Sequence, residues 1–183
     1  MRRNINVCVM MFVVLLISSC NSPIKPAKDT KSKTVSKILQ QEDGTISLKV
    51  EKADCYSDMV NPASNTAEWN VMVSKSGRFD VWLSSATKDT TDLNYKNSVM
   101  LSVRDNRLEA KPGCDNIVLN SNEVSYPYFR ADSFIGSLFI QDTGLYSIQL
   151  ISEKILPKDY KNSESSEDEN SKFLSVFLTP ISR

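Results

Sequence analysis

Apolar side chains occupy every second position in most segments of the chain after residue 45. This alternation is typical of a β-strand with one face in a core and the other in water. No stretch of ten or more residues in this region keeps the 3.6-residue apolar period of a helix. Many short strands of this kind predict an all-β fold, an antiparallel β-sandwich. The alternating segments are 46–50, 69–73, 79–83, 99–103, 146–150 and 174–178.

Turn-forming residues separate these segments. The loop 74–77 contains a glycine and predicts a hairpin between the strands 69–73 and 79–83. A second turn, at 142–144, precedes the strand 146–150. One further segment, 134–140, carries apolar residues at both parities. We therefore expect it to be a strand that is buried on both faces.

The first 20 residues have the layout of a secretory signal. Arg2 and Arg3 precede an apolar run at 5–17, and small residues follow it. The ending Ile17-Ser18-Ser19-Cys20 resembles the lipobox of bacterial lipoproteins. This resemblance implies that Cys20 becomes the lipidated N-terminus and that the lipid anchors the protein to a membrane of the cell envelope. Which side of that membrane it faces stays open.

Two alternatives to the lipid anchor remain. An ordinary signal peptide cleaved nearby would leave Cys20 unmodified. An uncleaved membrane helix is the other alternative, but the run 5–17 is shorter than the roughly 20 apolar residues that span a bilayer.

The remainder of the chain divides into two parts. Residues 21–43 are rich in Lys, Ser, Thr and Pro and predict a flexible polar tether, with a short helical turn near 35–40 left open. Residues 44–183 predict the β-sandwich domain. Within it, the acidic segment 163–171 predicts a surface loop. Its oxygen ligands leave a structural calcium ion open, although their spacing does not match an EF-hand; we expect no other metal or cofactor.

Composition excludes several classes of function. Lysine and arginine together number 22, as do aspartate and glutamate, so the balanced charge argues against a nucleic-acid partner. The chain contains no histidine, which removes Ser-His-Asp and Cys-His catalysis and histidine-bound zinc. Paired carboxylates hydrolyse glycosides without histidine, but no spacing singles out a pair. We therefore expect that the protein is not an enzyme.

Cys55 and Cys114 are the cysteines that remain once Cys8 leaves with the signal and Cys20 takes the lipid. Two cysteines in an oxidising compartment suggest a disulfide, which would stabilise the fold by about 4 kcal/mol. Two separate buried thiols are the alternative. Sequence alone leaves both open.

Several segments together resemble one known family, the galactose-binding-like jelly roll at the C-terminus of bacterial α-L-fucosidases. The resemblance spans roughly residues 45–182 and implies a carbohydrate-binding fold. Phe79 stands where the family usually has tyrosine, the acidic insertion is unusual, and no catalytic domain accompanies the module. The segments that carry it are Ala67–Val73, Ser76–Leu83, Asp142–Leu150 and Phe173–Pro180.

Aromatic rings that stack on sugars are the candidates for a binding site. Trp69 shares parity with the core residues of its strand, so we expect it to be buried. Trp82 has the opposite parity to its apolar neighbours and is expected on the outer face, either as a ligand platform or covered by a loop. Loop aromatics with polar neighbours complete the set of candidates, which is Trp82, Asn94, Tyr95, Tyr126, Tyr128 and Arg130.

These features together favour a membrane-anchored, noncatalytic carbohydrate-binding lipoprotein. The alternative is an envelope protein that uses the same sandwich to dock a protein partner.

Overall fold

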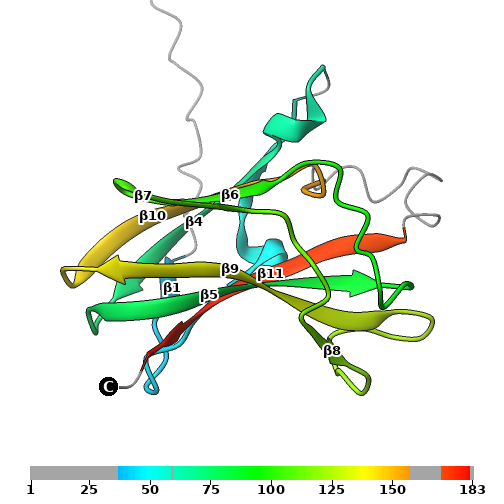
Figure 1. Ribbon diagram of the computed structural model, residues 1–183. Coiled ribbons are helices and arrows are strands. Elements are labelled where there is room, and N and C mark those ends of the chain that lie inside the picture. The colour runs from blue at the N-terminus through cyan, green and yellow to red at the C-terminus, as the bar shows by residue number, and fades with distance from the viewer. Residues whose placement is uncertain (1–36, 59, 157–169, 182–183) are drawn as a thin grey trace, which may run out of the picture. The chain divides into compact units, whose positions relative to one another are not determined.

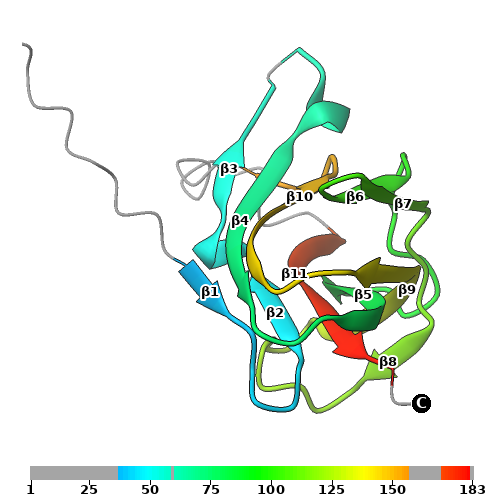
Figure 2. The same ribbon diagram turned by 90° about the vertical axis from the view of Figure 1, so that its left-hand side faces the viewer.

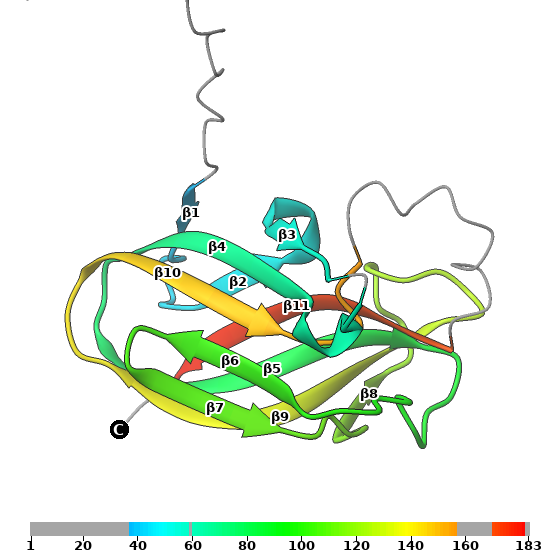
Figure 3. The same ribbon diagram turned by 90° about the horizontal axis from the view of Figure 1, so that it is seen from above.

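Two β-sheets stacked face to face make up the computed structural model, which describes residues 37–58, 60–156 and 170–181 (Figure 1). The prediction of an all-β sandwich is confirmed. The chain crosses from one sheet to the other several times, so strands distant in sequence become neighbours. Figure 3 views the stack with the six-stranded sheet towards the reader.

The six-stranded sheet has the order β1 (Lys37–Leu39), β4 (Thr66–Val73), β10 (Gly144–Ile151), β6 (Val99–Val103) and β7 (Asn106–Ala110), with β3 (Asp54–Tyr56) also paired to β4. The five-stranded sheet has the order β2 (Ile46–Lys49), β11 (Ser171–Pro180), β5 (Gly77–Thr87), β9 (Phe129–Ile140) and β8 (Asn116–Val118). Two short 3₁₀ turns, Val50–Lys52 and Pro62–Ser64, flank β3.

The core lies between the sheets and is filled by the alternating apolar side chains. On β5, Phe79, Val81 and Leu83 are at most 1% exposed, whereas Trp82 lies on the outer face. Trp69 on β4 is also buried, and its indole N–H donates to the carbonyl of Lys49 at 2.8 Å. The expected directions of both tryptophans are therefore confirmed.

The ordered sheet begins earlier than the predicted domain boundary at residue 44. Lys37–Leu39 forms β1, which is the only parallel partner among the described strands, and neither a tether nor a helical turn lies there. Burial of Ile38 holds β1 on the core. The side chain of Gln40 accepts hydrogen bonds from the backbone N–H groups of Ser74 and Lys75, at 2.9 and 2.7 Å. Apolar burial and amide hydrogen bonds thus fix this segment.

The expectation that 134–140 is buried on both faces is wrong. Phe134 is 43% and Phe139 is 53% exposed, because no layer among the described residues covers the outer face of β9. A bulge adds to the error: the register between β5 and β9 shifts between Val81 and Trp82, so that Ile135 has no partner and lies in the core.

Cys55 and Cys114 are separate thiols in the structure, so the disulfide is not formed. Cys55 lies on β3 and pairs with Ala67 of β4, whereas Cys114 follows β7 (Figure 2). The strands β10 and β6 lie between β4 and β7, and each strand adds about 4.8 Å. Gly113 and Asp115, which flank Cys114, bond to Ser133 and Phe134 of β9, whereas the two Cα atoms of a disulfide must lie within about 7 Å of each other.

Several predictions fall outside the described residues. The signal at 1–20, Cys20 and the tether as far as residue 36 are among them, as is most of the acidic segment 163–171. Across the described ranges, the chain contains no helix with the length and apolar character needed to cross a membrane. The same residues bring no three potential metal ligands together.

Candidate functional site

Three aromatic side chains form a row across the outer face of the five-stranded sheet. Trp82 on β5 is in register with Phe177 on β11 and with Phe134 on β9. The ring centroid of Trp82 lies 6.4 Å from that of Phe177, with the ring planes within 7° of parallel. The Phe134 ring lies 5.2 Å away and is tilted by 58°. Strand register therefore joins three residues from distant parts of the chain into one aromatic row.

The aromatic row is open to solvent on its outer side. Trp82 and Phe177 are half-buried because each packs against its neighbour, and Phe134 is 43% exposed. Large aromatic residues that stay exposed in a monomer commonly mark a binding surface. Ring faces of this kind can stack on the C–H groups of a sugar ring.

A charged network borders the aromatic row on one side. Arg130 on β9 donates from Nε and Nη2 to both carboxylate oxygens of Asp132, at 2.8 and 3.0 Å, and from Nη1 to Glu123 at 3.0 Å. Glu123 also pairs with Lys49 of β2 at 3.1 Å. The hydroxyl of Ser84 donates to Asp132 at 2.6 Å. These bonds fix the orientation of the charged groups within the network.

The network holds the Arg130 guanidinium against the aromatic row, 5.6 Å from the centre of the Phe177 ring. Its hydrogen bond to Asp132 raises the pKa of Arg130, so the group stays charged. A guanidinium has five N–H donors, of which three are used here, and the others remain for a ligand oxygen. The site therefore combines apolar ring faces with oriented polar donors.

The loop 119–128 connects β8 to β9 and reaches the charged network. Glu123 belongs to this loop and bridges Lys49 and Arg130, which lie on different strands of the sheet. Tyr128 lies near the end of the loop, with the ammonium groups of Lys88 and Lys172 at 5.2 and 5.4 Å from its ring centre. Two cations therefore lie beside the Tyr128 ring.

Tyr126, in the same loop, is 92% exposed and touches none of the three aromatic rings of the row. It is therefore not part of the aromatic row.

Tyr95 is buried, so the prediction that it offers a ring to a ligand is wrong. It is 3% exposed, and its hydroxyl shares a hydrogen bond with Ser85 Oγ at 3.0 Å. The neighbouring Leu93 is also buried, and Lys154 lies 5.9 Å from the Tyr95 ring centre. Tyr95 thus contributes to the core with a satisfied polar tip.

Asn94 lies in a different place, at a hollow of about 370 Å³ among the loops. Asn94 has a positive φ of 53°, and its backbone N–H bonds to Asp92. Across the hollow, the Glu153 carboxylate accepts hydrogen bonds from the backbone of Lys96 and the side chain of Asn97. No aromatic residue lines this hollow, which is mostly polar. The aromatic row is therefore the stronger candidate for a sugar-binding site.

The structure thus brings Trp82 and Arg130 together and separates Asn94, Tyr95 and Tyr126 from them. Phe134 and Phe177 are the site residues that the sequence interpretation missed. Phe177 has the opposite parity to Val176 and Leu178, which is the same signal that identified Trp82.

No protein-family model matches the chain, and no curated protein sequence matches it either. Among solved structures, an α-L-fucosidase from Vibrio sp. strain EJY3 is similar with a TM-score of 0.61 and 19% identity, over 78% of this chain and 24% of that chain. The chain therefore spans about a quarter of the length of that enzyme, and the likeness shows the fold alone.

Two more distant structures align at a TM-score of 0.45, too low to support an argument. They are a GH26-CBM35 β-(1,4)-mannanase from Podospora anserina, at 12% identity over 77% of this chain and 28% of that chain, and the insecticidal crystal protein Cry2Aa, at 10% identity over 78% and 22%.

Proposed function

We propose that this protein binds carbohydrate without catalysis, on the outer face of the five-stranded sheet. The aromatic row Phe177–Trp82–Phe134 with the Arg130 network at its border is the observation that carries the proposal. Sugar recognition uses flat apolar contact together with a few placed hydrogen-bond groups. The likeness of the fold to part of an α-L-fucosidase, a carbohydrate-acting enzyme, is compatible with this ligand class.

The arrangement of the carboxylates supports binding rather than hydrolysis. Glycosidases use two carboxyl groups for acid, base or nucleophilic roles at one bond. Here Asp132 and Glu123 both accept hydrogen bonds from Arg130, and Asp132 is 4% exposed. Both groups therefore hold the guanidinium in place instead of facing a substrate.

A panel of polysaccharides tests the proposal: laminarin, xylan, galactomannan, pectin, xanthan and peptidoglycan, each in native affinity gels. We expect one of them to retard the wild-type chain and to retard Trp82→Ala far less, by at least about tenfold in Kd or ~1.4 kcal/mol. Leu145→Ala is the matched control, since Leu145 is 54% exposed on the other sheet. Equal retardation of Trp82→Ala and the wild type would contradict the proposal.

The location in the cell is part of the same proposal. The lipobox-like ending at Cys20 supports a chain tied by its lipid to an envelope membrane. In cells that express the full chain, we expect it in the membrane fraction, and we expect Cys20→Ser to lose the lipid mass at the N-terminus. An unmodified thiol at position 20 in the mature wild-type protein would contradict the anchor.

A protein partner is the second candidate for the same face. It is favoured by the exposed apolar side chains Phe134, Phe139 and Ile181 on the outer face of the five-stranded sheet, of which Phe139 and Ile181 line one hollow. Cross-linking in the cell envelope followed by capture distinguishes the two. A single protein that is captured by the wild type and lost with Phe134→Ala, with no polysaccharide bound, would favour the partner.

A further inference from the structure

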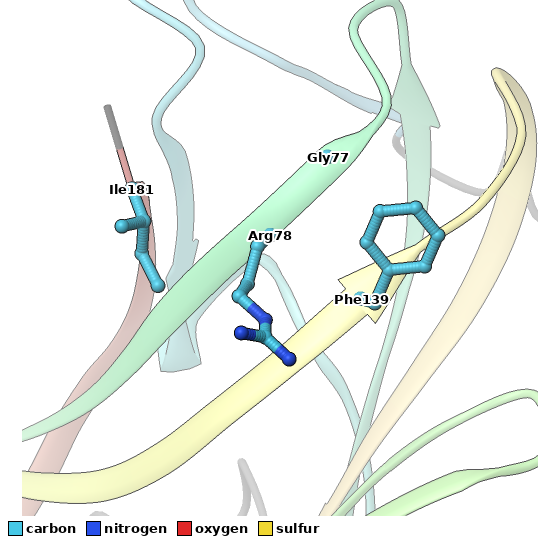
Figure 4. Close-up of a pocket in the computed structure, with 4 residues that line it drawn as sticks. All are labelled: Gly77, Arg78, Phe139 and Ile181. Carbon is cyan, nitrogen blue, oxygen red and sulfur yellow. The ribbon is translucent and has the colours of Figure 1, made fainter. Parts of the chain in front are cut away.

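A second row of exposed side chains crosses the same face further along the strands. Arg78 on β5 is in register with Phe139 on β9, and the backbone N–H of Ile181, after β11, donates to the carbonyl of Arg78 at 2.9 Å. Phe139 is 53% and Ile181 is 41% exposed. The three residues, with Gly77, line a hollow of about 590 Å³, and Figure 4 shows Arg78 between Ile181 and Phe139.

The two rows belong to one surface. Arg78 and Trp82 share the outer parity of β5 and are four residues apart, which is about 13 Å along a strand. The row between them is polar and centres on Asp80, which is in register with Thr179 and Ser137. The Ser137 hydroxyl donates to one carboxylate oxygen of Asp80 at 2.5 Å. The aromatic row, the polar row and the row of Ile181, Arg78 and Phe139 thus follow one another along the same three strands.

Arg78 differs from Arg130 in its partners. Arg130 is held by two carboxylates, whereas no acidic side chain in the described ranges pairs with Arg78. The Arg78 side chain is exposed and lies in the hollow between Ile181 and Phe139 (Figure 4). A guanidinium in this position presents its planar set of donors to oxygen atoms of a ligand.

We infer that the two rows are the two ends of one binding track, and that its ligand is an internal stretch of an extended glycan rather than a single terminal sugar. This inference rests on the proposed function. A monosaccharide is too short to contact both rows, whereas a chain of about three or more linked units covers the ~13 Å between them. End units stack on Trp82 and Phe139, and hydroxyl groups between them donate to Asp80.

The length of the oligosaccharide is the variable that tests the track. The purified full-length chain is titrated by calorimetry with oligosaccharides of one to six units, prepared from the panel polysaccharide that retards the wild type. We expect the wild-type affinity to rise about tenfold or more between two and four units and then to level off. Phe139→Ala and Arg78→Ala should remove this rise. Trp82→Ala should weaken binding at every length.

The outcomes separate the track from the proposed function. If wild type binds two and six units equally, or if both Phe139→Ala and Arg78→Ala keep the full dependence on length, the track is wrong. The proposed function survives in that case as long as Trp82→Ala still weakens binding. If no panel polysaccharide binds, or if Trp82→Ala binds like wild type, the proposed function and the track fail together.

Discussion

Arg130 connects the polar and aromatic parts of the site. Its guanidinium makes two hydrogen bonds with Asp132 and a third with Glu123, and lies over the Phe177 ring. Asp132 is 4% exposed, so this carboxylate depends on Arg130 and Ser84 for its hydrogen bonds. A buried charge that loses its partner is strongly destabilising.

The first prediction concerns the shape of the Arg130 side chain. Arg130→Lys keeps the charge but loses the planar pair of donors, so the free energy of unfolding should fall by about 1–3 kcal/mol. The matched control is Arg78→Lys, which pairs with no carboxylate in the described residues and should change it by less than about 0.5 kcal/mol. Urea denaturation measures both. Equal changes in the free energy of unfolding for the two substitutions would mean that the paired hydrogen bonds to Asp132 do not stabilise the fold.

The second prediction concerns the Cys114 thiol. Burial raises its pKa, and the nearby Asp89, Asp92 and Asp115 raise it further. The folded state therefore favours the neutral thiol. This preference is fully present below the unfolded pKa and is lost as the pH rises through the folded one. At pH 8, iodoacetamide should alkylate Cys114 more slowly in the folded chain than in urea, as followed by peptide mass spectrometry. Equal rates in the two states would contradict the shift.

At the scale of single elements, β5 shows what the sequence can predict. Strand geometry forces successive side chains to opposite faces, so parity alone placed Phe79 and Trp82 correctly. On β9 the same reasoning fails, because of the bulge and because no described segment covers the outer face, and Phe134 is exposed. Tyr95 lies in a loop, where no period links sequence to direction, and only tertiary packing determines its burial.

The third prediction concerns this bulge. Gly136 on β9 has a φ of +138°, and a Cβ atom there would approach Leu108 Cδ2 at 3.3 Å. Gly136→Ala should therefore lower the free energy of unfolding by about 1–3 kcal/mol. Gly77→Ala is the control, because Gly77 has a φ of +152° with no atom near the added Cβ. A thermal melt that shows Gly136→Ala no less stable than Gly77→Ala would rule out the contact with Leu108.

At the scale of the whole molecule, fold and proposed site use different faces of the same strands. The inner faces build the core, and the outer face of the five-stranded sheet carries both rows of the proposed site. We therefore expect site variants such as Phe139→Ala to leave the core unchanged. The site itself was only partly predictable, because its rows exist only once β11, β5 and β9 are paired, and that pairing joins residues far apart in sequence.

The most direct test of carbohydrate contact with the aromatic row uses the two tryptophans of the chain. Trp69 is 1% exposed and Trp82 is half-buried on the outer face, so acrylamide quenches mainly Trp82. We expect the polysaccharide that binds to protect the wild-type fluorescence from quenching, and Trp82→Phe to show no such protection. A polysaccharide that binds the chain tightly while Trp82 remains as accessible to acrylamide as before would contradict the account.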